Sequence, residues 1–385
     1  MRLLHTSDWH LGQKLMGRDR EEEHTFFLNW LLQLLKDKNI DILIISGDVF
    51  DKSVPPNYAL KLYYNFLSMA KKVDNLKNII ITAGNHDMSS SLNAPKELLK
   101  ALEIDVITDG DNLEQEIITI ERNNKISAVI CATPFLKEKI LKNNSYDIYK
   151  DREEIIRYGI KKHYEELLKK AKLITSKPII AMGHLTVSGA KLTPNSERDI
   201  YVGNLKGVNS SIFGDFDYIA LGHFHKFQKI QDNIYYSGSP IPLSFSESEE
   251  KKVILVDFDK NEKEFISIPL FRRLIIVSGT LEEIEKEFSE IQNNRLKSWI
   301  EVSIEGDFTG EFINKKIREI AKNYNIDILT VKYNQNKQEI REHLYTPPEN
   351  LTPIHVFKRK LDEENKENQE LFIEIFKEIL REIEN

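Results

Sequence analysis

Four apolar runs in this chain end in a glycine that is followed at once by an aspartate, asparagine or histidine. The glycines are Gly47, Gly84, Gly183 and Gly222. A fifth run, residues 2–10, brings such side chains to its end without a glycine. Short apolar runs bounded by glycine are typical of buried β-strands. Side chains so far apart in the sequence can meet only through the fold, so the pattern predicts five strands that end at one edge of a sheet.

The side chains at these strand ends are suited to binding divalent metal ions. The candidate ligands are Asp8, His10, Asp48, Asn85, His184, His223 and His225. Mixed nitrogen and oxygen ligation favours Mn, Fe or Zn over Ca, which prefers oxygen alone. We therefore predict a two-metal site that Asp48 bridges. Ions about 3.5–4 Å apart would lower the pKa of a shared water toward ~7, and the resulting hydroxide would attack a phosphorus atom.

His86 directly follows the candidate ligand Asn85 and is not itself needed as a ligand. We expect it to donate a proton to the leaving oxygen of a phosphoester. Asp51 is expected to orient His86 and to favour its imidazolium form. Asp87 is a candidate for supporting the ligands from behind. A single Gly-Asp or His-x-His is common, so the prediction depends on the joint occurrence of the five segments.

Other chemically active side chains fit structural roles better. His5 lies inside the first predicted strand and is expected to be a core histidine, and His24 on the first predicted helix is given no functional role. The only cysteine, Cys131, excludes an intramolecular disulfide and is expected to be a buried thiol. Three further histidines have no supporting pattern: His163, His343 and His355. Scattered basic residues are more typical of solvated surface than of phosphate contacts; they are Lys137, Lys139, Lys142, Lys191 and Arg198.

The overall charge gives weak guidance about partners. The formal net charge of −7 argues against nucleic acid, whose binders are usually basic. Two divalent ions would change the local balance, because Asp8 and Asp48 cancel only part of their charge and leave the site positive by about two charges. No apolar run approaches the ~20 residues needed to span a bilayer, and the N-terminus leads directly into the first strand, so we expect a cytoplasmic protein without a signal peptide.

Residues 1–270 alternate short apolar strands with amphipathic helices, which is typical of a layered α/β fold. Strands are predicted near residues 2–7, 41–46, 78–82, 104–107, 115–121, 126–131, 178–182, 217–221, 234–237, 252–258 and 264–269. Helices are predicted near residues 19–37, 56–72, 94–102 and 151–173.

The pattern changes after residue 270. Residues 271–345 read as a small β-α-β-α-β domain, in which Thr280 and Glu283 form a capping box at the start of a helix. Residues 346–385 begin with a proline-containing linker and end in an amphipathic helical arm. The apolar stripe of this arm includes Phe372, Ile375, Phe376 and Ile379, preceded by Phe357 on a shorter helix. The stripe either packs back on its own domain or docks on a partner.

The five strand-end segments resemble those of the calcineurin-like metallophosphoesterases. The matching segments are Asp8-Trp9-His10, Gly47-Asp48-Val49-Phe50-Asp51, Gly84-Asn85-His86-Asp87, Gly183-His184 and Gly222-His223-Phe224-His225. Two longer segments, residues 5–12 and 196–203, resemble the SbcD family of bacterial nucleases.

The resemblance implies a four-layer αββα sandwich with a small capping domain and a C-terminal helical tail. It implies an enzyme that cuts DNA with Mn²⁺, as a double-strand 3′→5′ exonuclease and a single-strand endonuclease. One metal would be held by Asp8, His10, Asp48 and His225, and the other by Asp48, Asn85, His184 and His223. His86 would be the catalytic histidine.

The resemblance also implies partners. The helical arm would grip a coiled-coil ATPase of the SbcC type, and the helices at residues 56–72 and 94–102 would form a homodimer face. Two alternatives remain at this point. One is a phosphatase or small-molecule phosphodiesterase of the same superfamily, which leaves the small domain and the tail unexplained. The other is a non-catalytic scaffold, which does not fit an intact set of candidate ligands.

Overall fold

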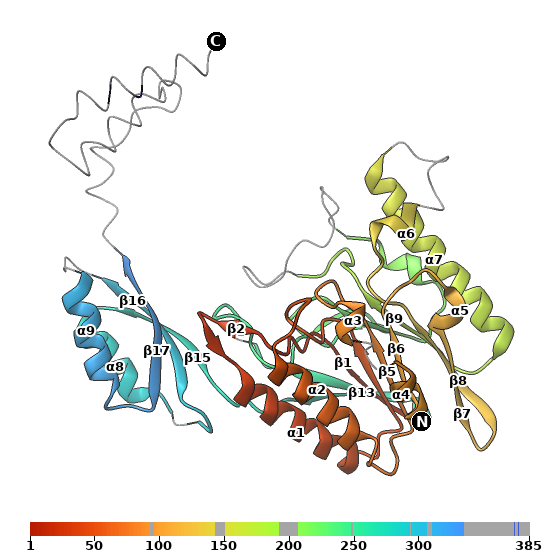
Figure 1. Ribbon diagram of the computed structural model, residues 1–385, viewed down its shortest axis with the longest axis horizontal. Coiled ribbons are helices and arrows are strands. Elements are labelled where there is room, and N and C mark those ends of the chain that lie inside the picture. The colour runs from red at the N-terminus through yellow and green to blue at the C-terminus, as the bar shows by residue number, and fades with distance from the viewer. Residues whose placement is uncertain are drawn as a thin grey trace.

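The computed structural model describes residues 1–92, 96–142, 151–191, 207–247, 249–292, 294–305 and 310–334, with Ile373 and Phe376. Two six-stranded sheets pack face to face, and helices cover their outer sides (Figure 1). A third, three-stranded sheet with two helices lies to one side of this sandwich (Figure 1). The predicted four-layer α/β fold with a small additional α/β unit is confirmed.

The first sheet carries the earlier strand-end segments. Its strand order is β14-β13-β1-β4-β5-β6. Neighbouring strands from β1 to β6 are parallel, while β13 is antiparallel to both β1 and β14. The strands are β1 (Arg2–Thr6), β4 (Ile42–Ser46), β5 (Asn78–Thr82), β6 (Ile104–Ile107), β13 (Lys252–Asp257) and β14 (Glu262–Ser267).

The second sheet carries the later histidines. Its strand order is β11-β12-β10-β9-β8-β7. The central strands β8, β9, β10 and β12 are parallel, and Gly222 of β10 pairs with His184 of β9. The strands are β7 (Ile117–Arg122), β8 (Lys125–Ala132), β9 (Ile179–His184), β10 (Tyr218–Gly222), β11 (Gln228–Gln231) and β12 (Ile234–Tyr236).

Successive side chains along each strand point to opposite faces of the sheet, so the strands contribute to two separate apolar layers. In β4, Ile42 and Ile44 face the second sheet, whereas Leu43 and Ile45 face the helices. Fully buried strands of this kind have apolar residues on both sides, which explains their continuous hydrophobic runs. The strand ends are therefore held between two cores.

The four predicted helices of the sandwich are present within a few residues of their predicted bounds. The described residues also contain four short helices that were not predicted. The helices are α1 (Glu21–Asp37), α2 (Asn57–Ala70), α3 (Ser89–Leu92), α4 (Lys96–Ala101), α5 (Leu113–Glu116), α6 (Glu138–Lys142), α7 (Arg152–Ile174) and the 3-10 helix η1 (Ser210–Phe213). The predicted strand at 115–121 was wrong at its start. The side chain of Asn112 accepts a hydrogen bond from the backbone N–H of Glu114 and caps the short helix α5, so the strand begins only at Ile117.

The third sheet forms a separate small core. It contains the parallel strands β15 (Leu274–Gly279), β16 (Ser298–Glu305) and β17 (Ile326–Asn334), covered by α8 (Leu281–Glu290) and α9 (Gly310–Ala321). The predicted capping box is present, since Thr280 and Glu283 exchange hydrogen bonds at the start of α8. Arg272 joins this unit to the sandwich: its guanidinium lies 4.3 Å from the ring centroid of Trp299 and 2.7 Å from the carboxylate of Glu22.

Three further predictions concern the cysteine, membrane-spanning segments and the C-terminal arm. Cys131 is buried, as expected, and burial raises the pKa of its thiol. Within the described ranges, no helix combines the length and the apolar character that a membrane crossing needs. Phe376 is helical and half-buried. The other proposed partner-binding residues lie outside the described residues; they are Phe357, Phe372, Ile375 and Ile379.

Candidate metal centre

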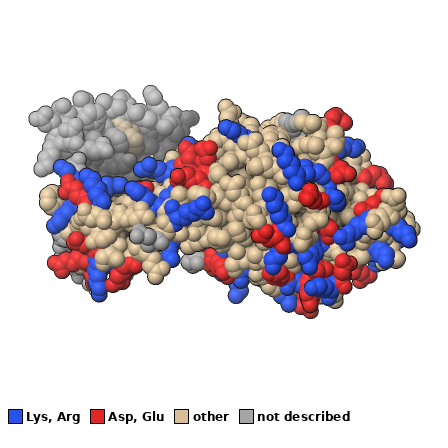
Figure 2. Space-filling view, turned by 90° about the horizontal axis from the view of Figure 1, so that it is seen from below, with Lys and Arg blue, Asp and Glu red and all other residues tan. Residues whose placement is uncertain are grey.

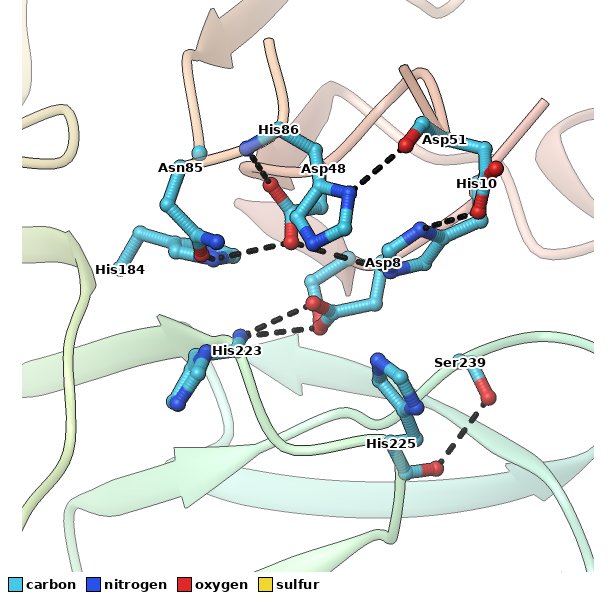
Figure 3. Close-up of polar contacts among 12 residues, drawn as sticks. Asp8, His10, Asp48, Asp51, Asn85, His86, His184, His223, His225 and Ser239 are labelled. Carbon is cyan, nitrogen blue, oxygen red and sulfur yellow. Dashed lines mark hydrogen bonds and ion pairs between the residues drawn. The ribbon is translucent and has the colours of Figure 1, made fainter. Parts of the chain in front are cut away.

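The strand-end segments of both sheets meet at one edge of the sandwich. The loops after β1 and β4 run side by side, because the N–H of Asp8 donates to the carbonyl of Gly47 and the N–H of His10 donates to the carbonyl of Asp48, both at 3.0 Å. The β9 and β10 ends approach from the second sheet (Figure 3). The sandwich therefore brings together residues that are more than two hundred positions apart, as the N–H of His223 bonded to the Asp8 carboxylate shows.

Three groups of potential ligand atoms lie close together in the described residues; one of them, His10, Asp51 and His86, includes half-buried residues at the edge of the centre, and the other two are fully buried. Ligand atoms of Asp8, His10 and His225 lie within 4.8 Å of one another, and so do those of Asp8, Asp48 and His184. All five residues are buried. The Asp8 carboxylate belongs to both buried groups, which places these two groups next to each other.

Asp48 and Asn85 extend these groups. An oxygen of Asp48 lies 3.2 Å from Nε2 of His184 and 3.7 Å from Nε2 of His10, so this carboxylate stands between the two histidines (Figure 3). Oδ1 of Asn85 lies 3.0 Å from the same Nε2 of His184. The bridging role of Asp48 stays a prediction.

His223 is placed differently from the other candidate ligands. Its main-chain N–H donates to both carboxylate oxygens of Asp8, at 3.0 and 3.1 Å. Its ring lies against that of His184, with centroids 5.5 Å apart, and it belongs to none of these groups of ligand atoms. Its assignment as a ligand therefore stays a prediction.

The backbone is strained at several of the candidate ligands. Asp8, His10 and Asp48 have φ values of 52°, 46° and 50°, and His223 has a φ of 103°. Positive φ is uncommon outside glycine and costs of order 1–3 kcal/mol per residue at such sites. Strain of this kind persists only where the surrounding structure holds the backbone in place. Here it is concentrated at four of the candidate ligands themselves.

The residues present fit divalent cations. His10 is 2% exposed, its Nδ1 faces the Asp51 carboxylate at 3.4 Å, and its Nε2 makes no hydrogen bond. A buried imidazole nitrogen without a hydrogen-bond partner is costly, and a metal ion is the partner that the position of His10 beside two buried aspartates suits. Burial would lower the pKa of His184, but the Asp48 carboxylate raises it to about 9.

Three of the four glycines of the recurring pattern leave room for close contacts at this edge of the sandwich. A Cβ atom on Gly222 would lie 1.8 Å from the carbonyl oxygen of Ser46, and one on Gly84 would lie 2.1 Å from Oδ1 of Asp48. A Cβ on Gly47 would lie 2.2 Å from Nδ1 of His184, and this glycine also has a φ of +84°. Any larger residue would therefore push the candidate ligands apart.

His86 lies at the edge of the centre beside Asp51. Its N–H donates to Asp48 at 2.9 Å, and its Nδ1 donates to the main-chain carbonyl of Asp51 at 2.7 Å. The carboxylate of Asp51 lies instead 3.4 Å from Nδ1 of His10 (Figure 3). Asp51 therefore contacts His86 through its backbone rather than through the carboxylate that we expected to orient it.

Asp87 holds the neighbouring loops in place. Its carboxylate accepts hydrogen bonds from the N–H groups of Val49, Phe50 and Gly84 at 3.1, 2.9 and 2.9 Å. Burial, together with the nearby charge of Asp48, raises the pKa of Asp87 to about 6. This side chain joins the loops after β4 and β5, as expected of a supporting residue.

The other histidines and lysines have structural surroundings where they are described. His5 is buried and bonded through Nδ1 to the Tyr218 hydroxyl at 2.9 Å, so its expected core role is confirmed. His24 is also buried, and burial lowers the pKa of each of these histidines to about 3. Lys137 is exposed and pairs with Asp109 at 3.1 Å. Arg198, His343 and His355 lie outside the described residues.

Sequence reasoning missed a buried carboxylate behind His225. Oε1 of Glu247 lies 3.3 Å from Nδ1 of His225. Glu247 stands in the segment Ser244–Lys251, which is rich in serine, glutamate and lysine and therefore reads as a solvated loop. No local pattern distinguishes it, because its contact depends on the path of the chain after β12.

Family models and curated relatives agree with this geometry. Residues 1–227 match the calcineurin-like phosphoesterase model, and residues 270–365 match a model described as the type 5 capsule protein repressor C-terminal domain. The SbcD subunit of the nuclease SbcCD from Escherichia coli K12 is 32% identical over 351 residues, covering 88% of this chain and 86% of the relative. The same subunits from Rhodobacter capsulatus and Staphylococcus epidermidis are 34% and 29% identical, covering 64% and 76% of both chains. The chain belongs to the calcineurin-like phosphoesterase family and, within it, to the family of SbcD nuclease subunits.

Proposed function

We propose that the chain is a metal-dependent phosphodiester hydrolase that cuts DNA as the nuclease subunit of an SbcCD-type complex. The observation that carries the proposal is the clustering of buried ligand atoms from Asp8, His10 and His225 and from Asp8, Asp48 and His184, with no hydrogen bond at Nε2 of His10. The relatives that share most of the chain are named as nuclease subunits, which supports DNA as the substrate.

The candidate ligands would hold two divalent ions, for which we propose Mn²⁺. Asp8, His10, Asp48 and His225 would bind one, and Asp48, Asn85, His184 and His223 the other. Such ions supply a nucleophile at neutral pH and positive charge that stabilises the transition state. Asp48 would be the ligand that both ions share.

His86 would donate a proton to the leaving oxygen. Hydrogen bonds at its N–H and at Nδ1 fix the ring, to Asp48 and to the Asp51 carbonyl respectively. Because Nδ1 donates to a carbonyl, Nε2 is the nitrogen that can exchange a proton with a substrate. The carboxylate of Asp51 faces Nδ1 of His10, so Asp51 would influence the charge of the metal centre through that histidine.

The face of the molecule in Figure 2 offers little other help in attracting a polyanion. On the face in Figure 2, lysine and arginine side chains are interspersed with aspartate and glutamate. The formal net charge of the chain is −7. Attraction of a phosphodiester would therefore come largely from the metal centre, which two divalent ions make positive.

The proposed assembly extends beyond the active centre. We propose that residues 1–270 are the nuclease domain, that residues 271–345 cap the DNA path, and that residues 346–385 bind a coiled-coil ATPase in the cytoplasm. Exposed apolar side chains on and beside α2 and α4 suit a homodimer face, namely Met69, Leu98 and Leu102. Sedimentation velocity tests this, since a particle of one 44.9 kDa chain at working concentration would contradict it.

The purified protein with Mn²⁺ is expected to degrade linear duplex DNA from its 3′ ends and to cut single-stranded circles. Chelation of the metal should abolish both activities, because the nucleophile and the charge stabilisation depend on the ions. The measurement uses duplexes labelled separately at each 3′ and 5′ end, so that the order of product lengths reports the polarity.

The same preparation distinguishes the alternative function. A phosphatase or small-molecule phosphodiesterase would turn over p-nitrophenyl phosphate or its bis ester and leave both DNA substrates intact. That outcome would remove the nuclease proposal while leaving the metal centre in place.

Deletion of residues 350–385 is expected to abolish binding to the ATPase partner and to leave Mn²⁺-dependent cleavage of single-stranded DNA within about twofold. The reason is that the apolar stripe follows residues 1–270, which contain all the candidate ligands, in the sequence. Co-purification with the ATPase and the cleavage assay give the two readings. Retained binding by the shortened chain would show that the arm packs on its own domain.

A further inference from the structure

A buried carboxylate stands behind one of the candidate metal ligands. The side chain of Glu247 is 1% exposed, and its Oε1 lies 3.3 Å from Nδ1 of His225. Its second oxygen pairs with the buried ammonium of Lys251, so the charged carboxylate faces the imidazole from inside the protein.

The other oxygen of Glu247 is fixed from several directions. Oε2 accepts a hydrogen bond from the N–H of Leu243 at 3.1 Å and lies 3.4 Å from the hydroxyl of Ser239. It also pairs with the buried ammonium of Lys251. These contacts leave the carboxylate little freedom to rotate.

Lys251 ties the same arrangement to the backbone of the ligand. Its Nζ donates to the carbonyl of His225 at 2.9 Å and to the hydroxyl of Ser239 at 3.0 Å. The N–H of Ser239 donates to the same His225 carbonyl at 3.0 Å. The ring and the main chain of His225 are thus both held by residues 239–251.

The histidines of the centre differ in what lies behind them. His225 faces Glu247, and His10 faces the carboxylate of Asp51 at 3.4 Å. His184 instead directs Nδ1 to the main-chain carbonyl of Ser46 at 3.0 Å. A carboxylate behind a histidine fixes its tautomer and orientation and makes it a more basic ligand.

We propose that Glu247, locked by Lys251, is a positioning residue for His225 and strengthens the binding of the ion that the Asp8–His10–His225 group holds. Nδ1 of His225 donates to Glu247, so Nε2 is directed to the ion. The group in which carboxylates back both histidines then holds the more tightly bound of the two ions. The inference rests on the proposed metal-dependent function.

Titration calorimetry of the metal-free full chain with Mn²⁺ tests this role. Glu247→Gln keeps the size of the side chain and removes its charge, and we expect the affinity of the tighter site to fall by about 10–100-fold. Glu250→Gln is the matched control, because Glu250 is exposed and pairs with Lys252 at the surface, at 3.2 Å. The control should bind both ions like the unaltered protein.

A double variant separates positioning from a purely structural effect. Glu247→Gln alone leaves the buried charge of Lys251 without its partner and can loosen the fold. In Glu247→Gln/Lys251→Met that charge is gone, so thermal stability should recover while the tighter Mn²⁺ site stays about 10–100-fold weaker. Recovery of metal affinity together with stability would overturn the proposal, and so would unaltered affinity in the folded single variant. If the unaltered chain itself failed to bind Mn²⁺, the proposed function would fail instead.

Discussion

Asp48→Asn is expected to lower the rate of DNA cleavage by at least about a thousandfold. The Asp48 carboxylate lies between Nε2 of His184 and Nε2 of His10 and also accepts the N–H of His86. We propose that both ions share this carboxylate. Losing its charge would therefore weaken the binding of both ions. Metal ions contribute several kcal/mol to such reactions, and about 4 kcal/mol corresponds to a thousandfold change in rate.

Metal binding should fall together with activity in this variant. Calorimetry and the electron paramagnetic resonance spectrum of Mn²⁺ give the comparison, since loss of the bridge should remove the signature of two coupled ions. Asp109→Asn is a suitable control, because Asp109 is an exposed aspartate that pairs with Lys137 away from the ligand groups. A variant that kept both ions and cleaved normally would show that Asp48 is not the shared ligand.

The place of the centre was predictable because two simple regularities combine. Buried strands show as continuous apolar runs, and the first polar residue after each run marks where a strand leaves the sheet. The run before His223 follows this rule, whereas the run before Asp48 ends in Ser46, which still belongs to its strand. Parallel neighbours within each sheet then bring such ends to one edge, as the pairing of β4 with β5 and of β9 with β10 shows.

The reason for the glycines was only partly predictable. Their position suggested sharp turns, but among the three that contact candidate ligands only Gly47 has a positive φ. Gly84 is needed because a Cβ would collide with Asp48 after the neighbouring strand β4, and Gly222 because a Cβ would collide with the Ser46 carbonyl across the gap between the sheets. Such collisions depend on how the two sheets approach, which one strand does not reveal.

Contacts made by loop side chains were the least predictable. Periodicity assigns faces to strands and helices, but Asp51 lies in a loop where backbone and side chain can point to different neighbours. Its carbonyl faces His86 and its carboxylate faces His10. Glu247 was missed for the same physical reason: its partner His225 is 22 positions earlier in the chain, and only the path of residues 239–251 brings them together.

His86→Ala is expected to lower the rate of DNA cleavage by about 10²–10⁴-fold, the usual contribution of a general acid, while both Mn²⁺ ions remain bound. His86 is held by the Asp51 carbonyl and by Asp48, and its main-chain N–H bond to Asp48 survives the substitution. Single-turnover cleavage and calorimetry measure the two effects separately. Parallel loss of metal would assign His86 to the ligands instead.

Asp51→Asn distinguishes the two ways in which Asp51 can act. The substitution keeps the main-chain carbonyl that accepts the hydrogen bond from His86, but it removes the carboxylate that faces Nδ1 of His10. We therefore expect cleavage at saturating Mn²⁺ to stay far closer to normal than in His86→Ala, while Mn²⁺ affinity falls by about 10–100-fold. If cleavage at saturating Mn²⁺ fell as far as in His86→Ala, the Asp51 carboxylate itself would be needed to keep His86 in its proton-donating form, and the backbone contact would not suffice.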